Sequence, residues 1–461
     1  MVKKIISGFL NSKLYPYIVG AFIFIFWLLS FLSVNGKINP LICNRCEWIE
    51  MIIIALSFLL IGVFSKDIDP MVPIVMYTPF IYAHPFYVIS MPYSLFIGIG
   101  ALIVSLIIHQ IIYKPKFKMG KNFIGIMALA VAMTLGGIAT KAEYLKLQFF
   151  ACLAIGVAIL FLYYSFSKNN YDFKKVAHNI NALGVLLVLQ IITFFVTCDN
   201  FIDSFFSKCV SVGWGIENNT SLMLLLTIPF TVYLVVINKG LKQVPFVLLT
   251  LLEFCAILFT YSRGATAAIV LGLVIIIPVG LVLTKDKLTY SLSILGVVMI
   301  LGGFFLILYT KYHDYYEQFL DYALRVNMEN MNGRTPIYEA IVTAFKENPI
   351  FGKGMFSPFY NIIETGVGEY QWGHSTVLHT ILTMGSFGVV ALLYHFFEKY
   401  FYLIKKMNKE KFFVLMGFLL SGLYGLIDVS YYFINYMMVL IIILAIIENT
   451  ISKEEEKNEV H

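Results

Sequence analysis

Apolar runs of about twenty residues recur along the chain, and they constrain its fold more than any other feature. A bilayer core is roughly 30 Å thick, which a helix of about 20 apolar residues crosses. Only 13% of the 461 residues are charged and 59% are hydrophobic, whereas a soluble domain has about 25% charged residues. Backbone polar groups in lipid must be paired within the protein, which favours helices. The sequence therefore predicts an all-α, polytopic integral membrane protein with about 12–14 transmembrane helices.

Fourteen segments of the chain are candidate spans. They lie at residues 14–34, 50–65, 71–88, 93–113, 123–140, 147–166, 178–197, 221–238, 244–261, 264–284, 291–310, 377–397, 412–428 and 434–450. The first is longer than the roughly 7–15-residue apolar region of a cleavable signal, so we expect it to be retained. Pro73, Pro79 and Pro85 fall in the third span, which we expect to be kinked or broken.

The distribution of Lys and Arg predicts the orientation of these spans. Alternate connecting segments hold 22 of the 33 Lys and Arg residues. These segments are 1–13, 66–70, 114–122, 167–177, 239–243, 285–287, 398–411 and 451–461. With fourteen spans they all fall on one side, which the positive-inside rule makes the cytoplasm. Both termini are therefore predicted to be cytoplasmic. This topology also accounts for the net charge of +6 without a nucleic-acid partner.

The six cysteines divide according to this topology. Cys152 and Cys255 fall inside spans, where a buried thiol behaves as a small apolar side chain. The four cysteines of the outer loops are Cys43, Cys46, Cys198 and Cys209. Disulfides are favoured over a zinc site in an oxidising space. In either case we expect their role to be structural.

One outer segment, residues 311–376, is about 66 residues long, and loops of this length are usually functional. Within it, Thr335 and Pro336 predict the start of a helix, and Asn348-Pro349 predicts its end. The expected apolar stripe of that helix consists of Ile337, Ile341, Ala344 and Phe345. Such a helix would either lie along the outer membrane surface or form a lid packed on the spans.

Arg263 is the first candidate for chemistry. The apolar stretch 244–284 carries only Glu253 and Arg263 as charges, and Tyr261-Ser262-Arg263-Gly264 interrupts it at the predicted outer face. An interfacial arginine often extends to lipid headgroups. Alternatively, its guanidinium matches phosphate oxygens in a bidentate geometry. Glu253 lies about 15 Å deeper, where a carboxyl is either functional or protonated and bonded to a neighbouring helix.

The long loop adds two arginines, Arg325 and Arg334. The simplest interpretation of each is a solvated surface charge. However, most other charges of the loop are acidic, so a basic patch for non-specific headgroup binding explains these arginines poorly.

His374 stands at the predicted outer end of the twelfth span, in the sequence His-Ser-Thr. Ser375 or Thr376 can cap the helix that follows. A histidine in this place is either a structural interfacial residue or a general base active near neutral pH. His379 lies well round the helix from it and is better interpreted as a packed polar residue. Gly385 follows about 16 Å deeper, with Gly388 one turn beyond, and this spacing lets another helix approach closely.

Taken in order, these motifs resemble the signature of the O-antigen ligase and polymerase superfamily of bacterial envelope proteins. The matching motifs are Ser262-Arg263-Gly264, Gly333-Arg334, Asn348-Pro349-Ile350-Phe351-Gly352-Lys353-Gly354, and His374-Ser375 with Gly385 and Gly388. The last motif matches in full the ligase pattern of His, a small polar residue, nine residues and Gly-x-x-Gly. The resemblance covers about residues 245–400.

The resemblance implies a glycosyltransferase that uses an undecaprenyl-diphosphate-linked glycan donor at the outer face of the cytoplasmic membrane. It implies that Arg263 and Arg334 hold the diphosphate, with Arg325 as a further candidate, and that Gly264 has a packing role. His374 would orient or deprotonate the hydroxyl of a glycan or lipid acceptor, which attacks the anomeric carbon with inversion. Neither a metal nor a nucleotide cofactor is implied.

This resemblance also suggests a division of the chain. Residues 1–243 would form N-terminal transmembrane helices, 244–400 the ligase-like core with the outer loop, and 401–461 the C-terminal helices and a cytoplasmic tail. A ligase passes glycan to another acceptor, whereas a polymerase joins repeat units. Because the donor chemistry is shared, the motifs do not separate the two, and only the complete histidine pattern favours the ligase slightly. A flippase or transporter for lipid-linked sugars is the alternative from another class, which predicts charged groups near the midplane.

Overall fold

The computed structural model describes residues 8–37, 41–82, 93–115, 119–139, 142–167, 171–212, 215–324, 334–355, 363–365, 368–370 and 373–459. Most of these residues are helical, and the described strands form two short antiparallel pairs. Eight described helices are long and apolar enough to cross a membrane, and five shorter apolar helices accompany them. The predicted all-α, polytopic membrane architecture is therefore confirmed.

The chain folds into two compact units, of which the first contains Met1–Phe117, Lys168–Leu324 and Lys453–His461. Its elements are α2 (Tyr15–Val34), α3 (Leu41–Phe64), α4 (Met71–Tyr77), η1 (Thr78–Ile81), α5 (Tyr93–Tyr113), α8 (Phe173–Thr197), α9 (Phe201–Phe205), β1 (Ser211–Val212), β2 (Gly215–Ile216), α10 (Glu217–Ile237), η3 (Gly240–Lys242), α11 (Val244–Phe259), α12 (Arg263–Leu283), α13 (Lys287–Lys311) and α14 (His313–Leu324). At the centre of this unit, nearly every residue of α10 is buried, and the helix packs against α8, α11 and α12.

The third predicted span is broken, as its prolines suggested. The α-helix α4 stops at Tyr77, and a single 3-10 turn carries the chain over Pro79 to Ile81. Proline removes a backbone donor and clashes with the preceding turn, so an α-helix cannot continue unchanged through it. Pro85, the last of the three prolines, lies outside the described residues.

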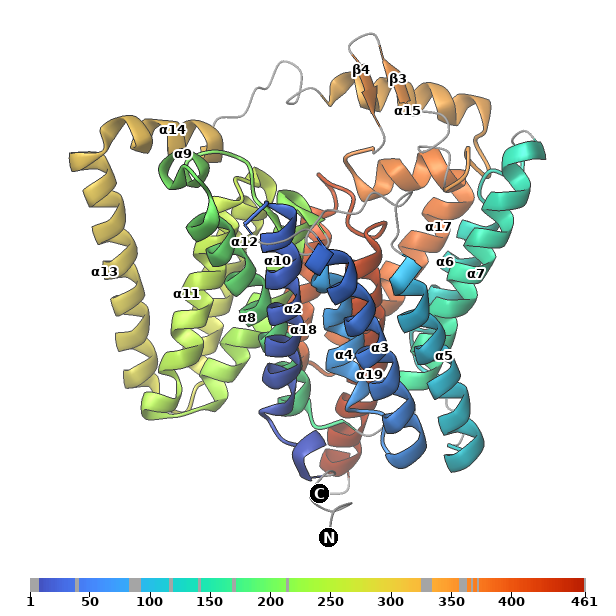
Figure 1. Ribbon diagram of the computed structural model, residues 1–461, viewed down its shortest axis with the longest axis horizontal. Coiled ribbons are helices and arrows are strands. Elements are labelled where there is room, and N and C mark those ends of the chain that lie inside the picture. The colour runs from blue at the N-terminus through green and yellow to red at the C-terminus, as the bar shows by residue number, and fades with distance from the viewer. Residues whose placement is uncertain are drawn as a thin grey trace. The chain divides into compact units, whose positions relative to one another are not determined.

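The second unit contains Lys118–Ser167 and Arg325–Ser452. Its elements are α6 (Phe123–Leu135), α7 (Ala142–Phe166), α15 (Thr335–Glu347), β3 (Ile363–Thr365), β4 (Gly368–Tyr370), α17 (Thr376–Ile404), α18 (Lys409–Tyr424) and α19 (Ile434–Glu459). The longest of these, α17, packs against α6, α15 and α18. In Figure 1, α15 crosses over the beginning of α17.

The predicted loop helix forms, and it packs on the protein. It spans Thr335–Glu347, with Arg334 rather than Thr335 at its N-cap and Asn348 at its C-cap. Its apolar stripe is buried, because Ile337 and Ile341 pack against Leu382 of α17. Of the two arrangements that the sequence allowed, the structure therefore has the helix packed on the span beneath it.

Each of the fourteen predicted segments holds a described helix, but some of these helices end earlier than predicted, among them α6, which stops at Leu135 rather than at residue 140. The helix predicted over 412–428 stops at Tyr424, and Gly425 is its C-cap. Residues 425–433 form a turn before α19, so Asp428 lies outside the helix rather than at its end. The hydropathy of this region does not distinguish the helix from the apolar turn that follows it.

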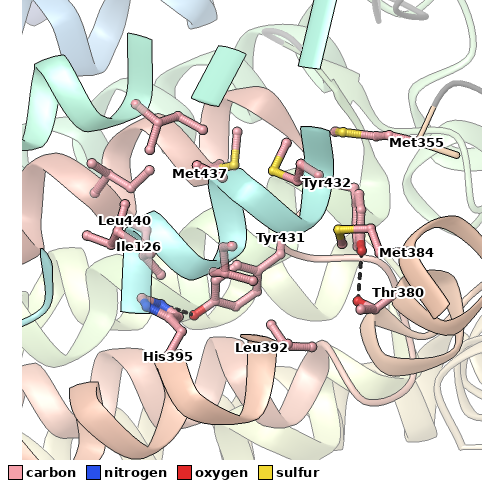
Figure 2. Close-up of a pocket in the computed structure, with 15 residues that line it drawn as sticks. Ile126, Met355, Thr380, Met384, Leu392, His395, Tyr431, Tyr432, Met437 and Leu440 are labelled. Atoms are coloured by element: carbon pink, nitrogen blue, oxygen red, sulfur yellow. Dashed lines mark hydrogen bonds between the residues drawn. The ribbon is translucent and has the colours of Figure 1, made fainter. Parts of the chain in front are cut away.

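A small apolar cavity of about 40 Å³ lies inside the second unit, among α6, α7, α17 and α19 (Figure 2). Methionines and tyrosines line it, and its polar groups include His395, whose Nε2 lies 3.4 Å from the hydroxyl of Tyr431. That hydroxyl also accepts a 2.6 Å hydrogen bond from the buried ammonium of Lys399. The cavity is large enough for a few water molecules and far too small for a lipid chain.

Candidate functional site

His374 and Asp428 meet at one end of the second unit. The Nδ1 atom of His374 lies 3.7 Å from Oδ1 of Asp428, which is an ion-pair distance and longer than a hydrogen bond. The side chain of His374 is 32% exposed, whereas that of Asp428 is 5% exposed. The pair thus has a buried carboxylate behind an imidazole that reaches the surface.

The backbone of His374 is strained. Its φ is +44°, in the left-handed region that non-glycine residues seldom occupy, although histidine does so more often than most. Ser375 follows as the N-cap of α17 and accepts a hydrogen bond from Leu378 N–H, which confirms the predicted cap. The carbonyl of His374 accepts a 3.3 Å hydrogen bond from the hydroxyl of Tyr338 on α15. The strained conformation of His374 is therefore held by the Ser375 cap that follows it and by the hydrogen bond from Tyr338.

Asp428 is oriented by two further hydrogen bonds. Its Oδ1 accepts from the backbone N–H of Val429 at 2.7 Å, and its Oδ2 accepts from the hydroxyl of Tyr424 at 3.0 Å. Burial alone would raise the pKa of this carboxyl. The neighbouring His374, the Val429 N–H and the charge of Arg334 outweigh burial and lower the pKa below its usual value. Asp428 is therefore a carboxylate at neutral pH.

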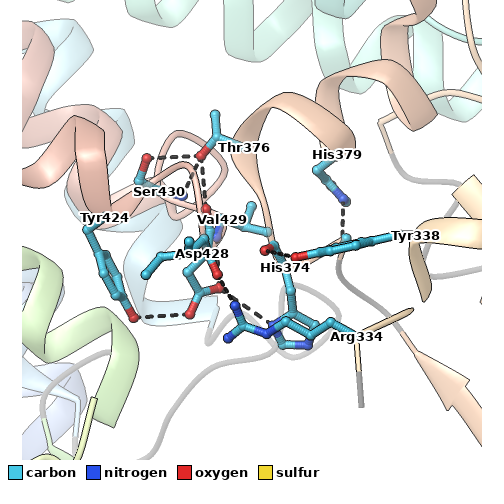
Figure 3. Close-up of polar contacts among 11 residues, drawn as sticks. Arg334, Tyr338, His374, Thr376, His379, Tyr424, Asp428, Val429 and Ser430 are labelled. Carbon is cyan, nitrogen blue, oxygen red and sulfur yellow. Dashed lines mark hydrogen bonds and ion pairs between the residues drawn. The ribbon is translucent and has the colours of Figure 1, made fainter. Parts of the chain in front are cut away.

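Arg334 joins this pair from the N-cap of α15. Its guanidinium donates a hydrogen bond to the carbonyl of Ile427, the residue before Asp428. Figure 3 shows Arg334 and His374 lying on the same side of Asp428. Two of the four functional residues that the resemblance selected, Arg334 and His374, are thus brought together by the fold of one unit.

Thr376 fixes the turn that carries Asp428 to the start of α17. The backbone N–H of Thr376 donates to the carbonyls of Gly425 and Asp428 at 2.8 and 3.0 Å. Its hydroxyl oxygen accepts from the N–H of Ser430 at 2.9 Å. These bonds satisfy donors at a helix N-terminus that have no partner within the helix. The position of Asp428 relative to His374 is therefore set by backbone contacts.

Gly385 marks a kink in α17 at which a loop segment replaces the helical hydrogen bonds. Its backbone is non-helical, with φ 62° and ψ −158°. The segment 349–354, from the Asn-Pro-Ile-Phe-Gly-Lys-Gly motif, lies against α17 where its helical hydrogen bonds are interrupted. The N–H groups of Lys353 and Gly354 donate to the carbonyls of Leu382 and Thr383 at 2.7 and 2.8 Å.

The same segment also accepts hydrogen bonds from the far side of the kink. Ser386 N–H donates to Pro349 at 2.9 Å, and Phe387 N–H donates to Ile350 at 3.1 Å. A β-carbon on Gly385 would lie 2.4 Å from the carbonyl oxygen of Ile350. The glycine motif and the Asn-Pro motif are therefore two halves of one backbone contact.

Gly385 and Gly388 are packed closely, and the segment that approaches Gly385 is a turn rather than a helix. The nearest neighbour of Gly385 is the 349–352 turn, and a β-carbon on Gly388 would meet the side chains of Met384 and Thr380 in its own helix. The kink brings successive turns of α17 close together, which is what requires the second glycine. His379 is fully buried against the ring of Tyr432, in agreement with its predicted packing role.

Arg263 lies in the first unit, as the first residue of α12. Its Nε donates to the carbonyl of Tyr322 at 2.8 Å, and its Nη2 lies 3.5 Å from the carbonyl of Asp321. These carbonyls belong to the last turn of α14, where a cation is favourably placed in the field of the helix. Gly264 is the second residue of α12. Arg325 lies outside the described residues.

The remaining sequence candidates have structural surroundings. Glu253 is fully buried, and its Oε1 accepts a 2.9 Å hydrogen bond from Thr227 of α10, so it bonds to a neighbouring helix. Cys198 and Cys209 are free thiols in this structure. The side chains of Cys43 and Cys46 lie outside the described residues. Among the residues whose placement is described, no group of three or more His, Cys, Asp or Glu is arranged to hold a metal ion.

Comparison with known proteins adds one finding. Residues 246–393 match the family model described as O-antigen ligase. The match includes Arg263, Arg334, His374 and the Gly385 kink, and it ends before Asp428. A search of curated proteins found no match to the chain.

Proposed function

We propose that this chain, of which residues 246–393 match the O-antigen ligase family model, transfers glycan from an undecaprenyl-diphosphate donor to an acceptor hydroxyl. The chain is a multi-pass membrane protein, and the match supports a role in glycan transfer. The proposed reaction takes place at the outer face of the cytoplasmic membrane. The distribution of Lys and Arg supports this orientation, with both termini in the cytoplasm.

The pairing of His374 with Asp428 is the observation that carries this proposal. A general base needs a nitrogen that is accessible to substrate and a partner that fixes the orientation of its ring. Nδ1 faces the buried carboxylate of Asp428, which leaves Nε2 as the nitrogen that receives a proton. The partial exposure of His374 supports access of an acceptor hydroxyl to that atom.

The proposed reaction is a single displacement. The acceptor oxygen attacks the anomeric carbon as its proton passes to Nε2 of His374. The bond from the anomeric carbon to the diphosphate oxygen breaks on the opposite face, and its electron pair leaves with undecaprenyl diphosphate. The product therefore has the inverted anomeric configuration. Asp428 stabilises the imidazolium that forms, and it acts as a positioning residue through His374.

The arginines are assigned to the diphosphate. A guanidinium presents paired N–H donors that match phosphate oxygens, and it stabilises the charge that develops on the leaving group. Arg334, next to the His374–Asp428 pair, is the first such residue, and Arg263 and Arg325 are the others. We assign no metal to this step, because the cations that neutralise the diphosphate are supplied by the chain itself.

Within this class we propose a ligase, which transfers glycan to a different acceptor, on the strength of the complete His374–Gly388 pattern. Incubation of the purified protein with labelled lipid-linked glycan separates the two activities. Label that appears on a non-glycan acceptor supports the ligase. A ladder of lengthening lipid-linked glycan would instead identify a polymerase of repeat units.

The direct test measures glycan transfer by purified protein in vesicles, with Arg263, Arg334 and His374 each replaced by alanine. We expect each variant to lose transfer while remaining folded in detergent. Lys346→Ala is the matched control, since it removes an exposed positive charge from the same helix as Arg334. Full activity in all three folded variants would overturn the proposed mechanism.

A further inference from the structure

The helix α14 is anchored to the first unit by one face only. Phe319 and Ala323 are buried in a cluster with Leu258 of α11, Tyr261 and Leu308 of α13. This cluster fastens α14 near the ends of α11 and α13, and Figure 1 shows α14 at the end of α13. The helix is strongly amphipathic, so its opposite face is turned outward.

The outward face of α14 carries side chains that are typical of a saccharide site. Its exposed residues include Asp314, Gln318, Asp321 and Tyr322, together with His313 and Glu317. From Asp314 to Tyr322 they extend over nine residues, or about 12 Å of helix. The ring of Tyr322 is 38% exposed and is supported from behind by the ring of Tyr261, with 5.4 Å between centroids. Carboxylates and amides bond sugar hydroxyls, and the electron-rich face of an aromatic ring attracts the C–H face of a sugar.

Arg263 lies directly beside this face. Its Nε–H donates to the backbone carbonyl of Tyr322 at 2.8 Å, so the guanidinium and the exposed ring belong to neighbouring parts of one surface. A sugar bonded to a phosphate is held within one covalent linkage of that phosphate. An anion bound by Arg263 therefore places its attached sugar close to the last turn of α14.

We propose that the outward face of α14 binds the saccharide of the donor that is nearest the diphosphate, with Tyr322 as the stacking residue and Gln318 as a hydrogen-bonding residue. This inference rests on the proposed function, in which Arg263 binds the diphosphate. In this proposal α14 recognises the glycan. Arg263 alone cannot do so, because its contacts to a diphosphate are the same whichever sugar is attached. If Tyr322 instead only anchors the helix at the membrane interface, its replacement should affect binding of both lipids equally, because that role does not depend on the sugar.

The test compares the binding of two lipids to the purified full-length protein in nanodiscs. One lipid is undecaprenyl diphosphate, and the other is the lipid-linked glycan extracted from the cells that make this protein. Tyr322→Ala is expected to weaken binding of the glycan-bearing lipid about tenfold and to leave binding of undecaprenyl diphosphate unchanged. Tyr322→Phe keeps the ring and should bind both lipids as the wild type does.

Two further variants make the result specific. Gln318→Ala removes an exposed side chain without disturbing the buried cluster, and it should weaken binding of the glycan-bearing lipid only. Tyr309→Ala removes an equally prominent ring, 53% exposed on α13, and should weaken neither. If Tyr309→Ala and Tyr322→Ala lose the same affinity for the glycan-bearing lipid, the tyrosines act only at the membrane interface and the proposal is overturned.

The failure of this inference can be told from the failure of the proposed function. If Arg263→Ala weakens binding of both lipids while Tyr322→Ala and Gln318→Ala weaken binding of neither, the assignment of Arg263 to the diphosphate stands and the proposed saccharide site is wrong. If Arg263→Ala weakens neither lipid, the assignment of Arg263 to the diphosphate fails, and the saccharide site fails with it.

Discussion

The imidazole of His374 and the carboxylate of Asp428 lie 3.7 Å apart, although they come from the start of α17 and from the turn after α18. Two backbone hydrogen bonds from Thr376 hold that turn against α17. Backbone contacts therefore fix the position of the pair, as the proposed general base requires.

Replacement of Asp428 by asparagine should lower glycan transfer without unfolding the protein. Asparagine keeps the shape of the side chain but cannot stabilise a protonated His374. We expect part of the roughly 10²–10⁴-fold contribution of a general base to be lost. The loss should appear in the rate of transfer and not in the affinity for the donor. An unchanged rate in the folded variant would remove Asp428 from the mechanism.

Asp428 should also make stability depend on pH in the acid range. The pKa of its carboxyl is lower in the folded protein than in the unfolded chain, so the charged form stabilises the fold. This contribution is complete above the unfolded pKa, about 4, and is lost as the pH falls through the folded pKa. The difference in melting temperature between wild type and Asp428→Asn should therefore shrink below about pH 4. A constant difference down to strongly acid pH would contradict this.

His374→Asn should separate catalysis from backbone strain. The φ of +44° at this position is one that asparagine also adopts readily. The variant should melt close to the wild type, while transfer falls roughly 10²–10⁴-fold because an amide cannot accept the proton. His374→Ala should lose as much activity and also lose stability. Retained transfer in His374→Asn would show that His374 only orients the acceptor.

Gly385→Ala should destabilise the protein strongly. The new β-carbon would meet the carbonyl of Ile350, and the φ of 62° is itself unfavourable by about 1–2 kcal/mol for alanine. Gly303 of α13 is the matched control, because a β-carbon there has no neighbour within 4 Å. Gly303→Ala should be neutral or slightly stabilising. Thermal melts in detergent would check both, and equal melting temperatures would mean that the kink is not required.

Treatment with a chelator should leave glycan transfer unchanged. In the proposed reaction the charge of the diphosphate is balanced by arginine, and the proton is taken by His374. We expect equal rates for protein purified with EDTA and for protein supplied with Mg²⁺ or Mn²⁺. A loss with EDTA that is restored by one of these ions would show that the reaction uses a metal.

The fold and part of the site could be predicted from the sequence, and a different physical cause made each feature visible. Membrane spans are visible because length and hydropathy must match the bilayer. The ends of α15 are visible because proline and Asn-Pro act locally. Arg334 and His374 were found as parts of an ordered motif, whereas their proximity depends on the packing of α15 on α17, which a linear pattern does not contain.

Asp428 was missed because it was counted as the end of an apolar span. A signal was present, since it is the only acidic residue between Glu410 and Glu448. A lone carboxyl in such a stretch is expected to have a buried partner or a function. The kink at Gly385 was missed for another reason. The glycine spacing also suits helix–helix contact, and only the long-range hydrogen bonds from 349–354 distinguish the two arrangements.

The contact between the 349–354 segment and α17 attaches α15 to α17. Four backbone hydrogen bonds attach the chain just after α15 to both sides of the kink, and Tyr338 attaches the first turn of α15 to His374. The helix α15 is thus fastened at both ends to α17, the helix that His374 precedes. Arg334 and His374 therefore share one backbone framework within the second unit. In the proposed reaction this framework presents the base together with one diphosphate-binding arginine, so a substitution that loosens it should impair both roles at once.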